Sequence, residues 1–434
     1  MNILVTGQCT LHWGRMEFGN IGNYYITEPF FRELRRVFPA STVKTTFQMS
    51  DQFCRDESVS TLPMELYYGW SGNDLALARE EVAIAEQHQS NGELSKTTSY
   101  IDELLWADLI VDFSGDIWGD NADFLGADRF EVGLLKNKTA QLLGKKTVML
   151  AGSPGPFANP ELKQMAKEVY SSFDLVTNRE PLSTRLLEEE GFDCSNTLTL
   201  ACPAFLFEPS SQGVVEETVK SIYDFGSTER KPVVGFIVCG WNFEQGPFDK
   251  WPRSDEDYGV FAEAVEFISE ELGARVCLMS HSNGFDIPPE PFRLKHGRDY
   301  PIIKQLQSVI EDRGIAKDVI ALDGIYDAWD TKAIIKSFDM LVSGRVHAAV
   351  AALSQSIPTV VIDYGHEPKA HKLKGFATIA GSEEFVVDPS SPGALKAGIK
   401  DCWSRREQYC KFLSAHIPTV RKQAETHFDL LKSL

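Results

Sequence analysis

The fold is decided by the stretch Met340-Leu341-Val342-Ser343-Gly344-Arg345-Val346-His347-Ala348-Ala349-Val350-Ala351-Ala352-Leu353. Its first three residues form a short apolar run, which is typical of a strand buried on both faces of a parallel sheet. The small apolar residues after His347 predict a tightly packed helix. Arg345 and His347 then lie at the helix N-terminus, where free backbone N–H groups and the positive end of the helix dipole favour an anion. A lone histidine is more often structural, but together with Gly344 and Arg345 it indicates an anion-binding site.

The same alternation of apolar runs and amphipathic stretches extends in both directions from this stretch. Strands are predicted at Met1–Val5, Thr42–Phe47, Leu109–Phe113, Thr147–Ala151, Leu175–Thr177, Val233–Cys239, Arg275–Met279, Val319–Leu322 and Thr359–Ile362. Helices are predicted at Tyr24–Val37, Glu161–Phe173, Pro181–Glu190, Glu256–Glu271 and Tyr300–Arg313. Such alternation favours βαβ units with parallel strands, and it occurs twice along the chain. The fold class is therefore α/β, with two doubly wound domains facing each other across a cleft.

The pause between the two runs of alternation divides the chain. A polar stretch at Glu208–Gly213 predicts a linker or a helix that crosses between domains. We expect a first domain at residues 1–207, a second at 208–391, and a C-terminal helical segment at 392–434 that packs back on the first domain. Asp51–Tyr100 shows no clear strand and is interpreted as an insertion that covers the site or binds an acceptor.

Composition limits the classes of function. The chain has 434 residues, a formal net charge of −19, 43% hydrophobic and 24% charged residues, which is typical of a globular protein and unfavourable for binding nucleic acid. No stretch predicts a membrane span, and the N-terminus is interpreted as a strand rather than a signal peptide, so we expect a cytoplasmic protein. Its eight cysteines include no CxxC pair, and no clustered His, Asp and Glu ligands indicate a metal site. A homo-oligomer is left open.

Residues that follow the predicted strands are candidates for ligand contacts, because open α/β sheets bind ligands beyond the carboxyl ends of their strands. Arg179 follows one strand and is suited to clamp a carboxylate or phosphate, the alternative being a salt bridge. Asp116, Trp118 and His281 follow others and are cleft candidates. Lys372 belongs to a basic cluster at Asp363–Phe376 that is either a phosphate-closing loop or a solvated surface loop.

These motifs, in this order, resemble the polysaccharide pyruvyl transferase family. The resemblance extends from Gly19-Asn20-Ile21-Gly22 to Lys372-Leu373-Lys374-Gly375-Phe376, and Ser343-Gly344-Arg345-Val346-His347 is its most specific part. Arg179-Glu180-Pro181-Leu182-Ser183 and Pro203-Ala204-Phe205 also match family signatures. The chain departs from the family pattern at Asn23 and Cys202, where the family often has aspartate, and at the unusual loop that contains His12, Trp13 and Arg15.

The resemblance implies a GT-B-like fold of two Rossmann-like domains, phosphoenolpyruvate as donor and co-substrate, and no cofactor. It implies a sugar hydroxyl pair as acceptor, and a pyruvate ketal and phosphate as products. It assigns His347 and Arg345 to catalysis and Arg179 to the donor. Ser343, Gly344, Val346 and Lys372 are the further donor-site candidates, and Asn20, Asn23, Asp116, Trp118 and His281 the acceptor or cleft candidates.

Several alternatives stay open at the level of the sequence. The acceptor is a glycan, a lipid-linked sugar or a nucleotide sugar. His347 is expected to move a proton, as base toward the hydroxyl or as acid toward the methylene of the donor. Two rival functions are a GT-B-like glycosyltransferase that uses a nucleotide sugar, and a non-catalytic ligand-binding member, which Asn23 and Cys202 would favour.

Overall fold

The first half of the chain forms a seven-stranded parallel sheet. The structure is a computed structural model and describes residues 1–8, 19–94, 96–120, 122, 126–209, 214–224, 230–243, 252–284, 286, 293–364 and 371–434. The sheet has the order β3-β2-β1-β4-β5-β6-β7. Its strands are β1 (Asn2–Thr6), β2 (Thr42–Thr45), β3 (Val59–Thr61), β4 (Leu109–Asp112), β5 (Lys146–Gly152), β6 (Leu175–Asn178) and β7 (Thr197–Thr199). The central strand β4 is buried along its whole length, and β1 is buried from Ile3 to Thr6, as their continuous apolar runs predict.

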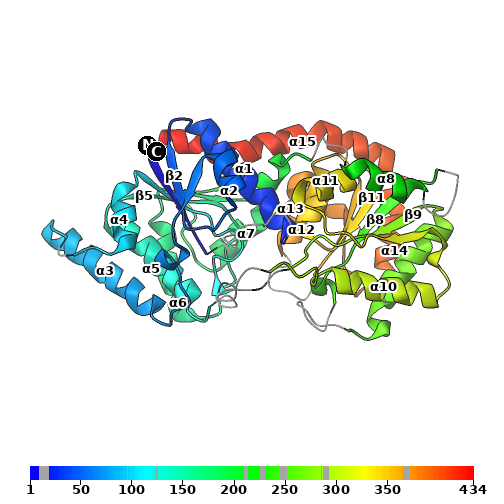
Figure 1. Cartoon of the computed structure of the whole chain (residues 1–434), viewed down its shortest axis with the longest axis horizontal. Helices are drawn as coiled ribbons and strands as arrows, with labels where there is room; N and C mark the ends of the chain where they lie inside the picture. Colours follow the sequence, from blue (N-terminus) through cyan, green and yellow to red (C-terminus); the bar gives the residue numbers. More distant parts are fainter. Residues whose placement is uncertain are drawn as a thin grey trace.

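The second half forms a six-stranded parallel sheet with the order β10-β9-β8-β11-β12-β13. Its strands are β8 (Val233–Ile237), β9 (Arg275–Leu278), β10 (Val319–Ala321), β11 (Met340–Ser343), β12 (Thr359–Ile362) and β13 (Val386–Val387). In both sheets the strand order reverses next to the first strand, as in dinucleotide-binding folds, so each sheet has a switch point between its first and fourth strands. The prediction of two doubly wound, Rossmann-like α/β domains is confirmed (Figure 1).

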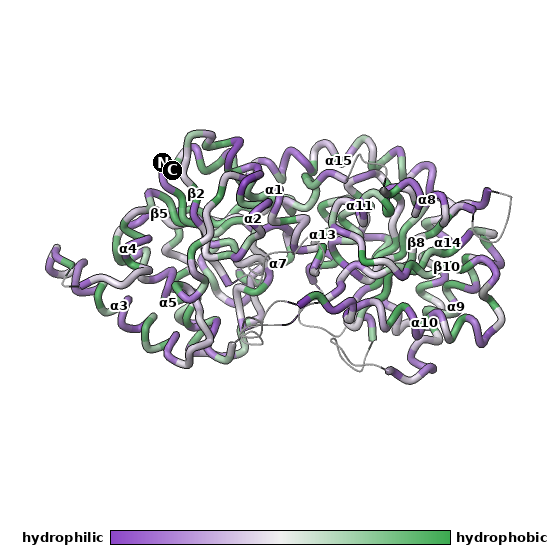
Figure 2. The backbone as a smooth tube through the Cα atoms, in the orientation of Figure 1, coloured by the Kyte–Doolittle hydropathy of each residue, from purple (hydrophilic) through white to green (hydrophobic). Residues whose placement is uncertain are grey.

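Helices flank both sheets. In the first domain they are α1 (Ile21–Val37), α2 (Asp51–Glu57), α3 (Asp74–Asn91), α4 (Ser99–Trp106), α5 (Arg129–Leu142), α6 (Pro160–Ser171) and α7 (Pro181–Glu189). The later helices are α8 (Val214–Asp224), α9 (Gly259–Glu266), α10 (Tyr300–Asp312), α11 (Ala328–Lys336), α12 (Val346–Leu353), α13 (His371–Ala380), α14 (Ala394–Ser404) and α15 (Arg406–Asp429). Figure 2 shows hydrophobic strands inside and mixed colouring along the helices, which matches amphipathic helices packed on a core.

The last long helix, α15, runs from the second domain to the first (Figure 1). Near its start, the ring of Tyr409 lies 4.5 Å from that of Phe385 in the second domain. Near its end, His427 contacts Thr177 of β6, with 2.7 Å between Nδ1 and Oγ1. The ring of Phe428 lies 5.6 Å from that of Phe30 in α1. The helix therefore fixes the two domains to each other along one side.

Apolar contacts also join the domains through α1. The ring of Tyr24 lies 5.0 Å from that of Trp329 in α11, and Tyr25 stacks at 4.7 Å on Phe207, which follows the short 3-10 helix Pro203–Leu206. Burial of large aromatic rings is a strong source of packing free energy. The two domains thus share a hydrophobic core on the side where α1 enters the second domain.

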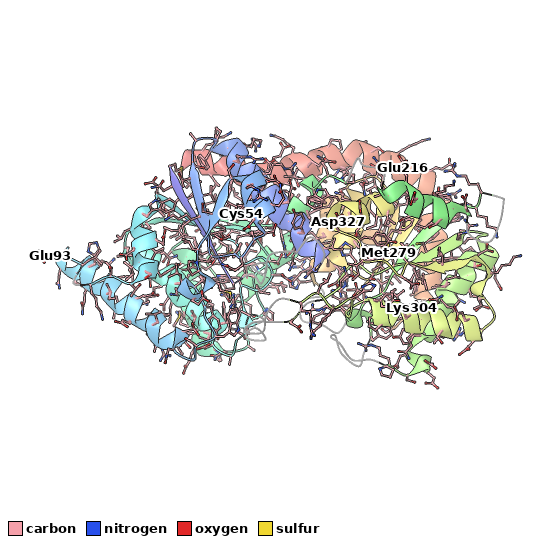
Figure 3. All side chains as sticks on the ribbon, in the orientation of Figure 1. Cys54, Glu93, Glu216, Met279, Lys304 and Asp327 are labelled. Atoms are coloured by element: carbon pink, nitrogen blue, oxygen red, sulfur yellow. The ribbon has the colours of Figure 1, made fainter. Side chains whose placement is uncertain are left out.

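The region 51–100 differs from its prediction. It contains the edge strand β3, which was missed because three residues with alternating polarity give too short a pattern. Its longest helix, α3, packs on α5 and extends to the outer tip of the molecule, where Figure 3 labels Glu93. It lies away from the second domain in Figure 1, which argues against a cover over a site between the domains.

Two further predictions meet the structure in part. The predicted helix Glu256–Glu271 is a 3-10 turn at Asp255–Tyr258, then α9, then a π-helical end at Phe267–Glu271. Within the predicted linker, Glu208 and Pro209 are described and residues 210–213 lie outside the described residues. Within the described residues, the helices are all too short or too polar to cross a lipid bilayer.

Candidate active site

Four charged or titratable side chains meet where the switch points of the two sheets face each other. Asp116 follows β4 at the first switch point, and His347 follows β11 at the second. Lys372, near the start of α13, places its Nζ 2.5 Å from Oδ2 of Asp116. Arg179, directly after β6, has its Nη2 3.7 Å from Oδ1 of the same carboxylate. The Asp116–Lys372 ion pair therefore links the two domains at this site.

Arg179 is held rigidly but is weakly neutralised. Its side chain is only 2% exposed, its Nε donates to Ser153 Oγ at 3.0 Å, and its guanidinium lies 5.5 Å from the ring centre of Phe376. The carboxylate nearest to it, on Asp116, is 41% exposed. Cys202, the position where the family often has aspartate, lies close enough that Arg179 lowers the pKa of its thiol, although burial raises it more. A fixed cation with a distant counter-charge is suited to bind an anion.

His347 presents an unused ring nitrogen to the same site. Its Nε2 is buried and has no hydrogen-bond partner among the described residues, and its ring lies 5.9 Å from that of Phe376. Burial lowers the pKa of His347 to about 3. The charges of Arg179, Lys372 and Arg345 lower it as well, while Asp116 opposes them. The imidazole is therefore neutral at physiological pH and has a nitrogen available for a proton.

Gly22 explains how α1 comes so close to this histidine. A Cβ atom at position 22 would lie 2.8 Å from Nδ1 of His347, closer than side-chain carbons approach. Only glycine allows the first turn of α1, from the first domain, to lie directly against the imidazole of the second domain. This contact gives a physical reason for glycine in the Gly19–Gly22 motif.

Arg345 makes a different contact from the one predicted from the sequence. Its Nε donates to both oxygens of Asp299 at 3.2 and 3.1 Å, and its Nη2 also contacts Oδ1. Asp299 is fully buried and also accepts the backbone N–H groups of His281 and Ser282 at 3.1 and 2.8 Å. This pair ties the loop after β11 to the loop after β9. Its first role is to position the helix that carries His347, and contact between Arg345 and the donor stays a prediction.

The start of α12 is built from the remaining donor-site candidates. Ser343 Oγ accepts the backbone N–H of Arg345 at 3.1 Å and donates to its carbonyl at 3.0 Å. Gly344 packs against the amide of Asn242, which leaves no room for a side chain. Val346 is the first helical residue, and no side chain caps the helix there. Its first N–H groups are therefore positioned to donate to a bound anion.

Two of the acceptor candidates lie at the start of α1, Asn20 just before the helix and Asn23 in its first turn. Asn20 forms an antiparallel bridge with Ser282, next to a 2.8 Å hydrogen bond from Asn283 N–H to the Gly19 carbonyl. Asn23 is half-buried in the first turn of α1, and its N–H donates to the Asn20 carbonyl at 3.0 Å. These backbone pairs place the Gly19–Gly22 motif directly on the second domain.

His281 is buried behind this junction, with its ring 5.4 Å from that of Tyr25. Burial lowers its pKa well below the usual value, and the charges of Arg345 and His347 lower it further. Its Nε2 is buried without a hydrogen-bond partner among the described residues. It supports the site as a neutral imidazole packed against α1.

Trp118 requires a correction, because it was predicted to face the cleft. It is fully buried, and its ring lies 5.7 Å from that of Phe130, 5.9 Å from that of Phe157 and 5.8 Å from that of Tyr170. A large indole at a strand end is stabilised more by core packing than by exposure, so this side chain supports the site from within the first domain. Two other predicted features, His12, Trp13 and Arg15, and residues 365–370 of the basic cluster, lie outside the described residues.

Three residues of the site were missed from the sequence alone. Asp299 precedes the helix start Tyr300-Pro301, so it looked like an ordinary boundary residue, yet it is the buried partner of Arg345. Phe376 lies between Arg179 and His347, and Ser153 orients the guanidinium. Only an acid next to a Tyr-Pro helix start was a usable signal; the other two depend on tertiary contacts.

The fold and the site together define a GT-B-like protein of two Rossmann-like domains, with a cationic site where the domains meet. The profile described as "Polysaccharide pyruvyl transferase" matches residues 20–366. The chain belongs to the polysaccharide pyruvyl transferase family, and this membership supports a pyruvyl-transfer role in polysaccharide biosynthesis.

A relative matches this chain in sequence, and solved structures match it in fold. The chain is 22% identical over 312 residues to "Amylovoran biosynthesis protein AmsJ" of Erwinia amylovora, which covers 71% of this chain and 69% of that protein. Anabaena HepE in complex with UDP matches with a TM-score of 0.56 and 14% identity, covering 100% of both chains. A glycosyltransferase from Rickettsia africae matches with a TM-score of 0.55 and 12% identity, covering 100% and 99%. At these identities the solved structures show the shared fold alone.

Proposed function

We propose that this chain transfers the pyruvyl group of phosphoenolpyruvate to two hydroxyls of a sugar, forming a pyruvate ketal and releasing phosphate. The observation that carries the proposal is the buried, unpartnered Nε2 of His347 beside two cations, Arg179 and Lys372. A small trianionic donor needs concentrated positive charge, and its chemistry needs one group that moves a proton. Phosphoenolpyruvate serves as a co-substrate in this reaction rather than as a bound cofactor.

The two cations, Arg179 and Lys372, are suited to different contacts with the donor. The planar guanidinium of Arg179 is suited to a bidentate contact with a carboxylate or phosphate, and Lys372 supplies a point charge from the other domain. The N–H groups at the start of α12 add further donors. Lys372 is paired with Asp116. When the donor binds, Lys372 exchanges this ion pair for a contact with the anionic group of the donor.

The transfer takes two steps. An acceptor hydroxyl adds to C2 of the enol phosphate and loses its proton, while the methylene carbon gains one in exchange, which gives a tetrahedral adduct that still carries phosphate. A second hydroxyl of the sugar then displaces the phosphate, which leaves with the proton of that hydroxyl, and the ketal closes. His347 takes the hydroxyl proton. Burial is the larger cause of its pKa of about 3, and a bound anion offsets the cationic charges that lower the pKa further, which raises the basicity of the imidazole. Asn20 and Asn23, at the start of α1, are proposed to contact the acceptor.

Donor binding is the first experiment. We expect phosphoenolpyruvate to raise the melting temperature of the full chain by several degrees, as any ligand selective for the folded state does, and UDP and UDP-glucose to leave it unchanged. Stabilisation by UDP without any by phosphoenolpyruvate would favour the glycosyltransferase alternative instead.

The variant His347→Gln tests catalysis. We expect phosphate release from phosphoenolpyruvate with a sugar acceptor to fall by about 10²–10⁴-fold, the usual contribution of a general acid or base. The dissociation constant of phosphoenolpyruvate is expected to change by less than about threefold, since the cations remain. His88→Gln, on α3 away from the second domain, is the control. Normal phosphate release by His347→Gln contradicts the assignment, and donor binding without release by the wild type on all acceptors points to a non-catalytic member.

A further inference from the structure

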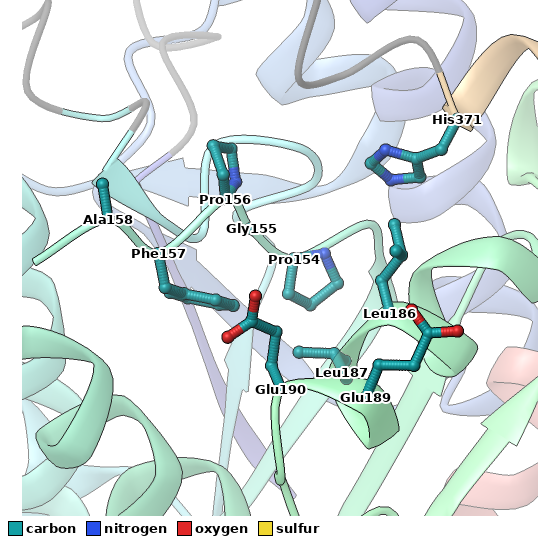
Figure 4. Close-up of a pocket in the computed structure, with 10 residues that line it drawn as sticks. All are labelled: Pro154, Gly155, Pro156, Phe157, Ala158, Leu186, Leu187, Glu189, Glu190 and His371. Atoms are coloured by element: carbon teal, nitrogen blue, oxygen red, sulfur yellow. The ribbon is translucent and has the colours of Figure 1, made fainter. Parts of the chain in front are cut away.

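A cavity of about 300 Å³ lies in the first domain beside the site of Arg179 (Figure 4). One wall is the loop after β5, Pro154–Ala158, and the other is the second half of α7, from Leu186 to Glu190. His371, at the start of α13 in the second domain, contributes to the rim. The volume is at the lower limit of small-molecule sites, roughly 300–1,000 Å³, which fits one sugar ring better than a nucleotide sugar.

The first wall of this cavity, Pro154–Ala158, directly follows Ser153, which holds the guanidinium of Arg179. Ser153, whose Oγ accepts from Arg179, donates its N–H to the Gly115 carbonyl at 2.9 Å. Two residues later, Gly155 N–H donates to the Trp118 carbonyl at 2.8 Å. The loop that lines the cavity is therefore fixed by the same segment that carries Asp116, which connects the wall of the cavity to the proposed donor site.

The rim of the cavity on the side of α13 is next in the chain to Lys372, the second cation of the site. Nε2 of His371 lies 3.2 Å from Oγ of Ser183, in the first turn of α7. The next residue in the chain is Lys372, which contacts Asp116. The rim of the cavity on this side is therefore one residue along the chain from a member of the Arg179–Asp116–Lys372 cluster.

The lining combines apolar and carboxylate groups. Pro154, Phe157 and Leu186 offer apolar surface, and Figure 4 shows the carboxylates of Glu189 and Glu190 on the side away from His371. Such surfaces pack the C–H face of a sugar ring, and carboxylate oxygens accept hydrogen bonds from its hydroxyls.

The same carboxylates have cations beside them. Glu190 is paired with Lys163 at 2.5 Å, and Glu189 lies 3.7 Å from Arg185 at the surface. The lining therefore offers hydrogen-bond acceptors with little net charge, which suits an uncharged occupant.

We propose that this cavity holds a neutral sugar ring of the acceptor and presents its hydroxyls to the donor site. The inference rests on the proposed function, because it assigns the second substrate of the same reaction. It commits to an uncharged glycosyl unit rather than the sugar of a nucleotide diphosphate.

Saturation-transfer NMR on the full chain tests the inference with four neutral probes: the methyl glycosides of galactose, glucose, mannose and N-acetylglucosamine. Each is measured with and without phosphoenolpyruvate. We expect at least one to bind the wild type, and Leu186→Trp, which fills the cavity, to weaken it at least about tenfold. Leu105→Trp, which adds the same indole to an exposed site on α4, is expected to bind as the wild type does.

Donor affinity, measured separately by calorimetry, keeps the two proposals apart. We expect Leu186→Trp to bind phosphoenolpyruvate within about twofold of the wild type. If the wild type fails to bind phosphoenolpyruvate, the proposed function is wrong, while the probes alone still decide the cavity. Absence of binding by all four glycosides, or undiminished binding to Leu186→Trp, overturns the inference. Ala158→Trp, at the exposed rim, replaces Leu186→Trp if circular dichroism shows that the latter does not fold.

Discussion

Each sheet has an arginine just beyond the carboxyl end of a strand, Arg179 in the first domain and Arg345 in the second. The carboxylates that partner these two arginines differ in distance and in burial. Arg345 of the second domain is bound through Nε and Nη2 by Asp299, which is fully buried. Arg179 of the first domain has its nearest carboxylate 3.7 Å away on Asp116, which is 41% exposed. A buried carboxylate cannot leave its arginine without a large desolvation penalty, whereas an exposed one can turn into water. The first pair is therefore structural, and the second is open to exchange with a substrate.

The surroundings of Arg179 reinforce this difference. The strand that carries it, β6, is supported from α15 by a neutral group, His427. Nε2–H of His427 donates to the Ala201 carbonyl at 2.8 Å, and its Nδ1 lies 2.7 Å from Thr177 Oγ1. Thr177 Oγ1 also accepts the N–H of Ala151, so its hydroxyl hydrogen is directed to the imidazole. Support by uncharged groups leaves the positive charge of Arg179 available to a ligand.

Ligand binding is expected to separate the two arginines. Arg179→Met is expected to weaken phosphoenolpyruvate binding by about 100-fold or more, because it removes a desolvated charge partner of the anion. Isothermal titration calorimetry measures this directly. Arg185→Met, an exposed arginine six residues later, is the matched control and is expected to bind normally. Unchanged donor affinity in Arg179→Met would break the comparison at once.

Replacement of Arg345 is expected to lower the stability of the folded protein. Arg345→Met leaves Asp299 buried without its cation, which costs about 3–5 kcal/mol of unfolding free energy for a buried pair. The double variant Arg345→Met with Asp299→Asn is expected to recover most of this loss, because the unpaired charge is gone. Urea denaturation measures both. A stable Arg345→Met protein that has lost donor binding would show that both arginines contact the donor.

The support of β6 by a neutral imidazole predicts a pH dependence. Burial lowers the pKa of His427 to about 4, below its unfolded value near 6.5, so the unfolded chain binds the proton first. The stability that this group contributes is complete above pH 6.5 and is lost as the pH falls toward 4. Between pH 7.5 and 5 we expect a loss of about 2 kcal/mol from this residue. His427→Gln is expected to flatten urea stability curves by that amount, whereas His416→Gln keeps the wild-type slope.

Most of the strands could be predicted from the sequence because the patterns that indicate a strand are local. Continuous apolar runs such as Leu109–Phe113 and Met340–Val342 become central parallel strands, since both faces of each are covered. The edge strands β3, β7 and β13 have two or three residues each and carry too little pattern to be recognised. The edge strand β10 is equally short but lies within the apolar run Val319–Leu322, which was predicted. The strength of the apolar pattern, rather than the position in the sheet, decided which strands were found.

The sequence singles out the cations of the candidate site and Asp116, but not which carboxylate pairs with which cation. Arg179, Arg345, His347 and Lys372 were recognisable from their places after strands or in a motif. That Asp299 would bind Arg345 and Asp116 would bind Lys372 depends on contacts 46 and 256 residues apart in the chain. Trp118 was misjudged for the same reason, because nothing local distinguishes an indole in a core from one in a cleft.

The smallest effect concerns Asp116, the exposed member of the comparison. Asp116→Asn keeps the shape but removes the charge that competes with the donor for Lys372 and Arg179. Asp116 is 41% exposed, although Lys372 and Arg179 are buried. Because water screens one member of each pair, we take a pair to contribute about 1 kcal/mol, and we expect the dissociation constant of phosphoenolpyruvate to fall by about fivefold. Calorimetry at low salt measures the change, and Asp102→Asn on α4 makes the same charge change far from the site. Weaker donor binding in Asp116→Asn would mean that this carboxylate orients Lys372 for the donor rather than yielding to it.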